Sequence, residues 1–381
     1  MTTTERKPIH KRWSTVLAAL FALLMIILPI FISEQIGGWS KKYTSPIGFS
    51  TASIPDMNGK VAIVTGANTG IGYHTALELV RKGAYVIVAA RSPEKGRAAV
   101  AKIEGELKDN KSSGKATFLS LDLASLDSVE NFATEFLSLE LPLHVIVLNA
   151  GVMKSPGAAF VGQELSYGFE TTNDGFEYHI GVNYIAHAYL TDLLLPKLKE
   201  SAPSRVVSVS SMAEMGAYEE GMRFEDWSTG GKMPIGYEDG RAYGQSKLAN
   251  LMWANELAKR NNGTGVTAYA CHPGVIITEL MRYMDSEMAE QTQENGIFAV
   301  MLSQVLKNFF NLALFTAKDG ALTQLHLATA PEHKLENGKN YHPIGKVTEP
   351  NHALGRNDIL QTALWEETEK AIRQRSEYKK E

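Results

Sequence analysis

Two polar side chains, Tyr243 and Lys247, stand four residues apart in a segment with a helical pattern. That spacing places both on one face of a helix. A phenol ordinarily loses its proton near pH ~10, but a neighbouring ammonium stabilises the phenolate and lowers that pKa. The pair therefore predicts an acid/base that works near neutral pH. Such a spacing is common by chance, and the competing interpretation is a surface pair of little energetic consequence.

A serine precedes this pair at the end of an apolar run. Val206 to Val209 reads as a buried strand and is followed by Ser210 and Ser211. A hydroxyl at Ser211 would hold a substrate oxygen while Tyr243 exchanges a proton with it. Ser210 is the neighbour with which Ser211 could be confused.

A glycine-rich turn follows the first apolar run and leads directly into a helical pattern: TGANTGIG, from Thr65 to Gly72. Gly66 allows the tight turn, Gly70 lets backbone approach a pyrophosphate, and Gly72 permits close packing of helix on strand. The helix N-terminus adds free N–H groups and a positive dipole. This context favours a dinucleotide site over a structural turn, with contacts also from Asn68, Thr69 and Ile71.

The end of the second apolar run distinguishes the two dinucleotides. An acidic residue there would bind the ribose of NAD, but this sequence has Arg91 and Ser92. A guanidinium suits a 2′-phosphate, and the serine could add a hydroxyl. We therefore expect NADP(H) as cofactor, against the alternative of a solvated surface arginine.

Two further strand ends fit the same crevice, because ligands of such sheets lie beyond the carboxyl ends of the strands. Asp122 and Leu123 would touch adenine, although helix capping near Ser125 competes for Asp122. The small residues that close the fourth strand would admit a cofactor near the backbone; they are Asn149, Ala150 and Gly151.

Short apolar runs alternate with amphipathic stretches along this part of the chain, which predicts parallel strands joined by right-handed helical crossovers. The expected fold is α/β, a doubly wound parallel sheet of Rossmann type in a single domain. The predicted strands are 61–64, 85–90, 117–121, 144–148, 206–209 and 266–270, and the predicted helices include 72–82, 94–107 and 357–370.

Composition narrows the class of protein. The 381 residues carry a net charge of −4, with 21% charged and 44% hydrophobic residues. No basic field predicts nucleic-acid binding, and global disorder is excluded. A single cysteine, Cys271, rules out an intramolecular disulfide.

The N-terminus differs from this soluble body. Residues 1–15 are basic, and residues 16–32 are an uncharged apolar run without a small-x-small cleavage site after it. We expect a membrane anchor at 16–32, as a span or a hairpin, a linker at 33–57, the enzyme domain at 58–365 and a charged tail at 366–381. The excess of basic residues before the run places the N-terminus in the cytoplasm and the enzyme domain across the membrane. A hairpin anchor or a re-oriented first helix would leave the domain in the cytosol instead. Endoplasmic reticulum or another endomembrane is the expected location.

Residues 57 to 365 resemble the short-chain dehydrogenase/reductase family, and more closely its retinol-dehydrogenase-like and WW-domain-oxidoreductase-like members. The motifs are TGANTGIG, AARS, LPLHVIVLNAG, VSVSS, YGQSK and CHPGVIITEL. The resemblance implies that Tyr243 is the acid/base, that Lys247 binds the nicotinamide ribose and that Ser211 positions substrate. It also implies that Asn183 supports a water-mediated proton relay, and that the nicotinamide side is lined by Pro273, Gly274 and Thr278.

The interval between Ser211 and Tyr243 and the wording of HIGVNYIAHAYL depart from the common family pattern. The interval from 212 to 240, with Trp227, Met233 and Tyr237, predicts a flap over the substrate. An apolar lid at about 280–316 would cover an oily substrate or dip into a bilayer, with a core or dimer helix as the alternative. A lipophilic carbonyl or alcohol, such as a retinoid or steroid, and a homodimer are the expected partners.

Two other functions stay open at the level of sequence. One is a catalytically silent, cofactor-binding scaffold or membrane-complex subunit, against which the intact Ser211, Tyr243 and Lys247 argue. The other is reduction of a tetrapyrrole double bond, as in the related protochlorophyllide reductases, for which the single cysteine gives little support.

Overall fold

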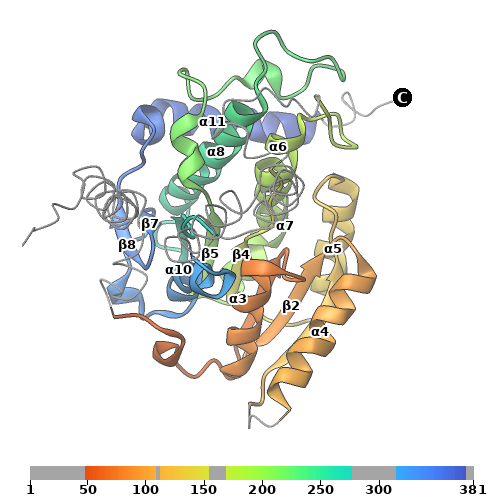
Figure 1. Ribbon diagram of the computed structural model, residues 1–381, viewed down its shortest axis with the longest axis vertical. Coiled ribbons are helices and arrows are strands. Elements are labelled where there is room, and N and C mark those ends of the chain that lie inside the picture. Colours follow the sequence, from red (N-terminus) through yellow and green to blue (C-terminus); the bar gives the residue numbers. More distant parts are fainter. Residues whose placement is uncertain (1–47, 109–111, 154–168, 277–314, 375–381) are drawn as a thin grey trace, which may run out of the picture.

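The computed structural model describes residues 48–108, 112–153, 169–276 and 315–374 (Figure 1). Within these residues the strands form one eight-stranded sheet in the order β3-β2-β1-β4-β5-β6-β7-β8. All neighbours from β3 to β7 pair in parallel, and β8 is antiparallel to β7. The strands are β1 Val61–Thr65, β2 Tyr85–Ala90, β3 Lys115–Ser120, β4 Val145–Leu148, β5 Ser204–Val209, β6 Val266–Cys271, β7 Asn340–His342 and β8 Lys346–Thr348.

Helices cover both faces of the sheet, each over its own hydrophobic core. One core packs β1 and β2 against α3 Gly70–Arg81, α4 Pro93–Leu107 and α10 Ala317–Thr329. The other lies under α5 Leu126–Ser138, α7 Ala186–Glu200 and α8 Asp239–Arg260, with α11 Asp358–Arg373 packed on α8 (Figure 1). Shorter turns are α6 Tyr178–Ile180, a π-helical turn Gly181–Ile185 and 3₁₀ turns at Thr51–Ser53, Met212–Gly216, Phe224–Asp226, Glu332–Lys334 and Ala353–Arg356.

The prediction of a doubly wound parallel sheet is confirmed, and its six strands lie within two residues of the expected positions. The strand run Tyr85–Ala90 was predicted to the residue. Sequence patterns missed β7 and β8, because three-residue strands at a sheet edge carry no apolar run.

The packed domain extends beyond both predicted boundaries. Phe49, Ile54 and Met57 are buried in the core of the α3 face, so the segment expected to be linker contributes to the domain. At the other end α11 continues to Arg373 with Ala371 buried, so packed structure passes residue 365.

Among the described helices, none is long and apolar enough to cross a bilayer. The expected anchor at 16–32 lies outside the described residues, as does the expected lid up to residue 314.

Candidate active site

The predicted acid/base pair lies in the first half of α8, at the carboxyl edge of the sheet. Tyr243 is half-buried and Lys247 is buried. The Lys247 Nζ donates a 3.0 Å hydrogen bond to the carbonyl of Val209, the last residue of β5, and lies 5.9 Å from the centroid of the Tyr243 ring. Burial lowers the pKa of Lys247 to about 8, which leaves the amine largely protonated at neutral pH.

The electrostatics of Tyr243 differ from the sequence expectation. Burial raises the pKa of its phenol, while a hydrogen bond with Ser211 acts in the opposite direction. The expected lowering by Lys247 is absent here, because the ammonium is held at the Val209 carbonyl and stands beside the ring. Desolvation therefore outweighs the stabilisation of the phenolate in this structure.

The two serines after β5 have separate tasks. Ser210 is buried and its Oγ donates 2.7 Å to the carbonyl of Lys247, which ties α8 to the strand end. Ser211 is half-buried, and its Oγ caps the following 3₁₀ turn by accepting from Ala213 N at 3.2 Å. Its side chain also opposes the rise in the pKa of the Tyr243 phenol. Ser211 is thus the serine that faces the phenol.

Asn183 is fully buried in the π-helical turn between α6 and α7. Its Oδ1 accepts from Val152 N at 2.7 Å, and its Nδ2 donates to Val152 O at 3.0 Å and to Ser246 Oγ at 2.9 Å. A Cβ added at Gly151 would lie 3.4 Å from Asn183 Oδ1 and 3.3 Å from Lys247 Nζ. The amide and the amine therefore both border Gly151 at the end of β4.

The glycine loop joins β1 to α3 in the predicted manner. Gly66 and Gly70 have positive φ of +66° and +58°, which favours glycine. A Cβ at Gly72 would lie 2.5 Å from both the Gly66 carbonyl and Asn149 Nδ2, so helix and strand ends touch. Thr69 is exposed and does not cap α3 with its side chain, so the N–H groups of the first turn have no side-chain cap from it.

Arg91 and Ser92, the expected partners of a 2′-phosphate, directly follow β2. Arg91 is exposed and, within the described part of the chain, makes no hydrogen bond or ion pair. Ser92 is the N-cap of α4 and accepts from Lys95 N at 3.3 Å. The cap holds this turn in place, and the guanidinium extends from it at the same sheet edge as the glycine loop.

The remaining predicted cofactor contacts also follow strand ends. Asp122 accepts from Ala124 N at 3.0 Å, and the cap of α5 is Ser125, so Asp122 forms a local turn and does not cap the helix. Leu123 is buried beside it. After β6, Pro273 and Gly274 are buried, and Gly274 has φ +98° with its Cβ position 2.8 Å from the Phe315 ring. Thr278 lies outside the described residues.

After β4, two residues form hydrogen bonds with the start of the glycine loop. Asn149 donates to the Thr65 carbonyl and Ala150 N to the Thr65 hydroxyl, each at 2.9 Å. These bonds leave the exposed Gly151 at the mouth of the site.

Sequence reasoning missed a buried carboxylate beside Tyr243. Glu177 Oε1 accepts from His179 Nδ1 at 2.8 Å and from the Tyr237 hydroxyl at 3.0 Å, and the His179 ring stands edge-on to Tyr243 with centroids 6.0 Å apart. Burial raises the pKa of Glu177, but bonds from His179 and Ile180 outweigh it and lower the pKa. The spacing of Glu177 and His179 before the Asn183 turn was the available signal.

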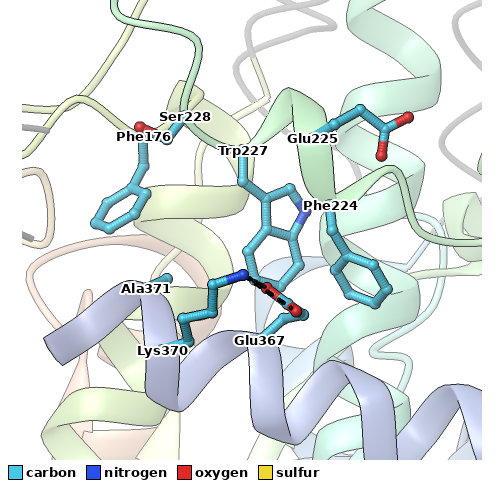
Figure 2. A pocket seen from close by; sticks show the side chains of 8 residues that line it. All are labelled: Phe176, Phe224, Glu225, Trp227, Ser228, Glu367, Lys370 and Ala371. Atoms are coloured by element: carbon cyan, nitrogen blue, oxygen red, sulfur yellow. Dashed lines mark hydrogen bonds and ion pairs between the residues drawn. The ribbon is translucent and has the colours of Figure 1, made fainter. Parts of the chain in front are cut away.

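The segment 212–240, which was expected to form a flap over the substrate, is partly buried in the core. Trp227 is 3% exposed and packs edge-on against Tyr184 and Phe224, so it belongs to the core. It lines a cavity of about 360 Å³, and Lys370 and Glu367, which line the same cavity from α11, pair at 3.0 Å (Figure 2). No residue that lines this cavity belongs to the predicted site. Met233, by contrast, is 62% exposed.

Comparison with known proteins identifies the family. The short chain dehydrogenase profile matches residues 60–223, and mouse (Mus musculus) retinol dehydrogenase 12 is 40% identical over 318 residues, covering 84% of this chain and 87% of that protein. The chain belongs to the short-chain dehydrogenase family. Human (Homo sapiens) retinol dehydrogenase 11 is 37% identical and covers 91% of this chain and 95% of its own length.

Solved structures of the family share the fold. An uncharacterised protein from Mycobacterium paratuberculosis superposes with a TM-score of 0.60 at 29% identity, covering 86% of this chain and 98% of that one. L-Sorbose reductase from Gluconobacter frateurii, solved with NADPH and L-sorbose, superposes with a TM-score of 0.57 over 76% of this chain and 97% of its own, at 18% identity. Family membership makes this chain an oxidoreductase and supports a nicotinamide cofactor.

Proposed function

We propose that this oxidoreductase depends on NADP(H), interconverts a carbonyl and an alcohol on a small lipophilic substrate, and uses Tyr243 as the acid/base. The observation that carries the proposal is the convergence of Ser211, Tyr243 and Lys247 at the carboxyl ends of β4 and β5. Parallel α/β sheets bind ligands at this edge.

The residues divide the work of moving one proton. In the reducing direction the Tyr243 hydroxyl donates its proton to the carbonyl oxygen, and Ser211 hydrogen-bonds the same oxygen and holds it near the phenol. Lys247 would bind the ribose of the nicotinamide, and with the cofactor in place its charge would offset the phenolate that remains. A bound nicotinamide would supply the hydride to the carbonyl carbon. Oxidation of an alcohol runs through the same contacts in reverse.

The cofactor would lie along the sheet edge. The N–H groups at the start of α3 suit a pyrophosphate, and the unpaired Arg91 suits the 2′-phosphate that distinguishes NADP(H) from NAD(H). Ser92 keeps its hydroxyl on the α4 cap, so we assign it the support of this turn and a secondary contact at most. The remaining assigned contacts are Asp122, Leu123, Asn149, Gly151, Pro273 and Gly274.

The proposed substrate class is supported by similarity to known proteins and by two apolar stretches of the sequence. Proteins similar along nearly the whole chain are named retinol dehydrogenases, and the apolar stretches at 16–32 and 297–316 suit work at a membrane. A retinoid, a steroid or a similar oily carbonyl is the proposed substrate, and an endomembrane the proposed location.

The test is turnover of NADPH by the detergent-solubilised full chain against a panel of lipophilic aldehydes and ketones. Tyr243→Phe should lower kcat at least ~100-fold, the usual worth of a positioned acid. Tyr85→Phe is the matched control, because it removes a phenol that bonds Thr117 on the sheet. Wild-type turnover in Tyr243→Phe would remove Tyr243 from the mechanism, while cofactor binding without any turnover would favour the scaffold.

Cofactor choice is tested separately. Arg91→Ala should raise the KM for NADPH by roughly 10- to 100-fold, the range for a bond to a charged group, and leave the KM for NADH unchanged. Arg97→Ala, an exposed arginine one turn into α4, should change neither. Equal use of both cofactors by the wild type would sink the assignment of Arg91.

A further inference from the structure

One buried histidine joins the glycine loop to the predicted proton relay. His187 lies in the first turn of α7 and is 2% exposed. Among the described residues of the predicted site, it hydrogen-bonds Asn183. Its Nδ1 lies 3.0 Å from the main-chain oxygen of Asn183, and its Nε2 lies 2.9 Å from the hydroxyl of Thr65.

The partners fix the tautomer of this ring. A carbonyl oxygen only accepts, so Nδ1 must carry the proton that is donated to Asn183. Burial, with a smaller contribution from the nearby Lys247, lowers the pKa of His187 to about 4, so the ring is neutral near pH 7. The Nε2 of a neutral ring with a protonated Nδ1 is an acceptor, and the Thr65 hydroxyl donates to it. That hydroxyl oxygen in turn accepts from Ala150 N at 2.9 Å.

The chain of bonds runs between two functional ends. Thr65 is the last residue of β1 and directly precedes the glycine loop, to which Asn149 also bonds. At the other end, the side-chain amide of Asn183 hydrogen-bonds Val152 and Ser246. The group that His187 orients is therefore the main-chain carbonyl of Asn183. Asn183 and Lys247 both border Gly151.

We propose that His187 is a positioning residue that fixes the Asn183 carbonyl for proton transfer and couples it to the cofactor loop through Thr65. The inference rests on the proposed function, in which Asn183 supports the relay to Lys247 and Tyr243. The π-helical turn releases the Asn183 region from regular helical geometry, and the imidazole holds it in one arrangement. A side chain that fills the same space but lacks the two ring nitrogens of His187 would pack there. It would not hold the Asn183 carbonyl in this arrangement.

The experiment compares three variants of the full chain in the NADPH turnover assay. His187→Leu removes both bonds and should lower kcat about tenfold with the KM for the carbonyl substrate unchanged. His187→Asn retains a donor near the Nδ1 position and should recover most of that loss. Thr191→Val is the matched control, because it removes a 2.9 Å bond to the His187 carbonyl in the same buried helix and should leave kcat unchanged.

The coupling to the cofactor loop has its own readout. Thr65→Val keeps the shape of the side chain and removes the hydroxyl between His187 and Ala150. It should lower kcat severalfold, and its effect should not add to that of His187→Leu. If His187→Leu does not accumulate as folded protein, Thr65→Val and His187→Asn carry the test.

The outcomes separate this inference from the proposed function. If Tyr243→Phe loses activity but His187→Leu keeps the wild-type kcat, the role of His187 is overturned and the proposed function stands. If His187→Leu does not fold, a wild-type kcat in Thr65→Val has the same meaning. Equal loss in His187→Leu and Thr191→Val, which is the pattern of general destabilisation, also overturns the role of His187. Retained activity in Tyr243→Phe overturns the proposed function itself.

Discussion

Replacing Lys247 with methionine should abolish turnover and at the same time stabilise the protein near pH 7. The amine is 4% exposed and its pKa is lowered from 10.5 to about 8 by burial. The native state therefore binds a proton less readily than the unfolded chain. At about 1.4 kcal/mol per pKa unit, this shift corresponds to a cost of about 3 kcal/mol at neutral pH. Methionine has a similar length and carries no charge to desolvate.

The lost hydrogen bond reduces this gain only slightly. Val209 O would still accept from Asn250 Nδ2 at 3.3 Å, so it keeps a partner after the amine is removed. A bond of this kind contributes about 1 kcal/mol. We therefore expect Lys247→Met to raise the free energy of unfolding by about 2 kcal/mol at pH 7.

The pH dependence of the stability difference between the two proteins tests whether burial of the Lys247 ammonium causes it. Below the native pKa of about 8 both states of the wild type are protonated, and the full cost is present. Between about pH 8 and 10.5 only the unfolded chain holds the proton, so wild-type stability rises relative to the variant as pH increases. Urea unfolding of both proteins at pH 7 and pH 9.5 measures this, with Lys232→Met as an exposed control. A variant that is less stable at pH 7, or a difference that does not narrow at pH 9.5, would refute the reasoning.

Three further predictions follow from the same contacts. Ser211→Ala should lower kcat at least ~10-fold with little change in melting temperature, whereas Ser210→Ala should destabilise by about 1 kcal/mol through loss of its bond to Lys247 O; the reverse pattern would exchange their roles. Gly72→Ala places a Cβ 2.5 Å from the Gly66 carbonyl and should weaken NADPH binding in a fluorescence titration; unchanged affinity would contradict the close approach. Glu177→Gln should destabilise by about 2 kcal/mol at pH 7, because its carboxylate accepts four hydrogen bonds, three of them buried, and its pKa is lowered. That contribution exists above the unfolded pKa of 4.5 and is lost as pH falls through the lower native value. The melting temperatures of the two proteins should therefore differ at pH 7, and the difference should shrink as the pH is lowered below 4.5.

Sequence patterns predicted the sheet because parallel strands buried on both faces must be continuously apolar, as Val61–Thr65 and Val145–Leu148 are. They also predicted which residues would meet at its carboxyl edge, since Tyr243, Ser211 and Gly66 each follow or face a strand end. Local patterns were sufficient there because connectivity alone brings strand ends together.

What the sequence could not predict depends on contacts between distant segments. The direction of the Tyr243 pKa shift is set by how deeply the ring is buried and by where the Val209 carbonyl holds Lys247. The placement of Trp227 in the core depends on Tyr184, which lies far from it in the chain. Burial and long-range packing of this kind have no periodic signature in a single sequence.

The packing of α11 on α8 constrains how copies of the chain can associate. Lys259 of α8 hydrogen-bonds Asp358 and Gln361 of α11. The Arg260 guanidinium lies 4.7 Å from the centroid of the Trp365 ring. The Thr368 hydroxyl of α11 also lies 2.6 Å from the hydroxyl of Tyr184 in the π-helical turn. The outer face of the helix that carries Tyr243 is thus already occupied from within the same chain. A second copy would have to build its interface on another surface, so each protomer would keep its own acid/base helix sealed from its partner.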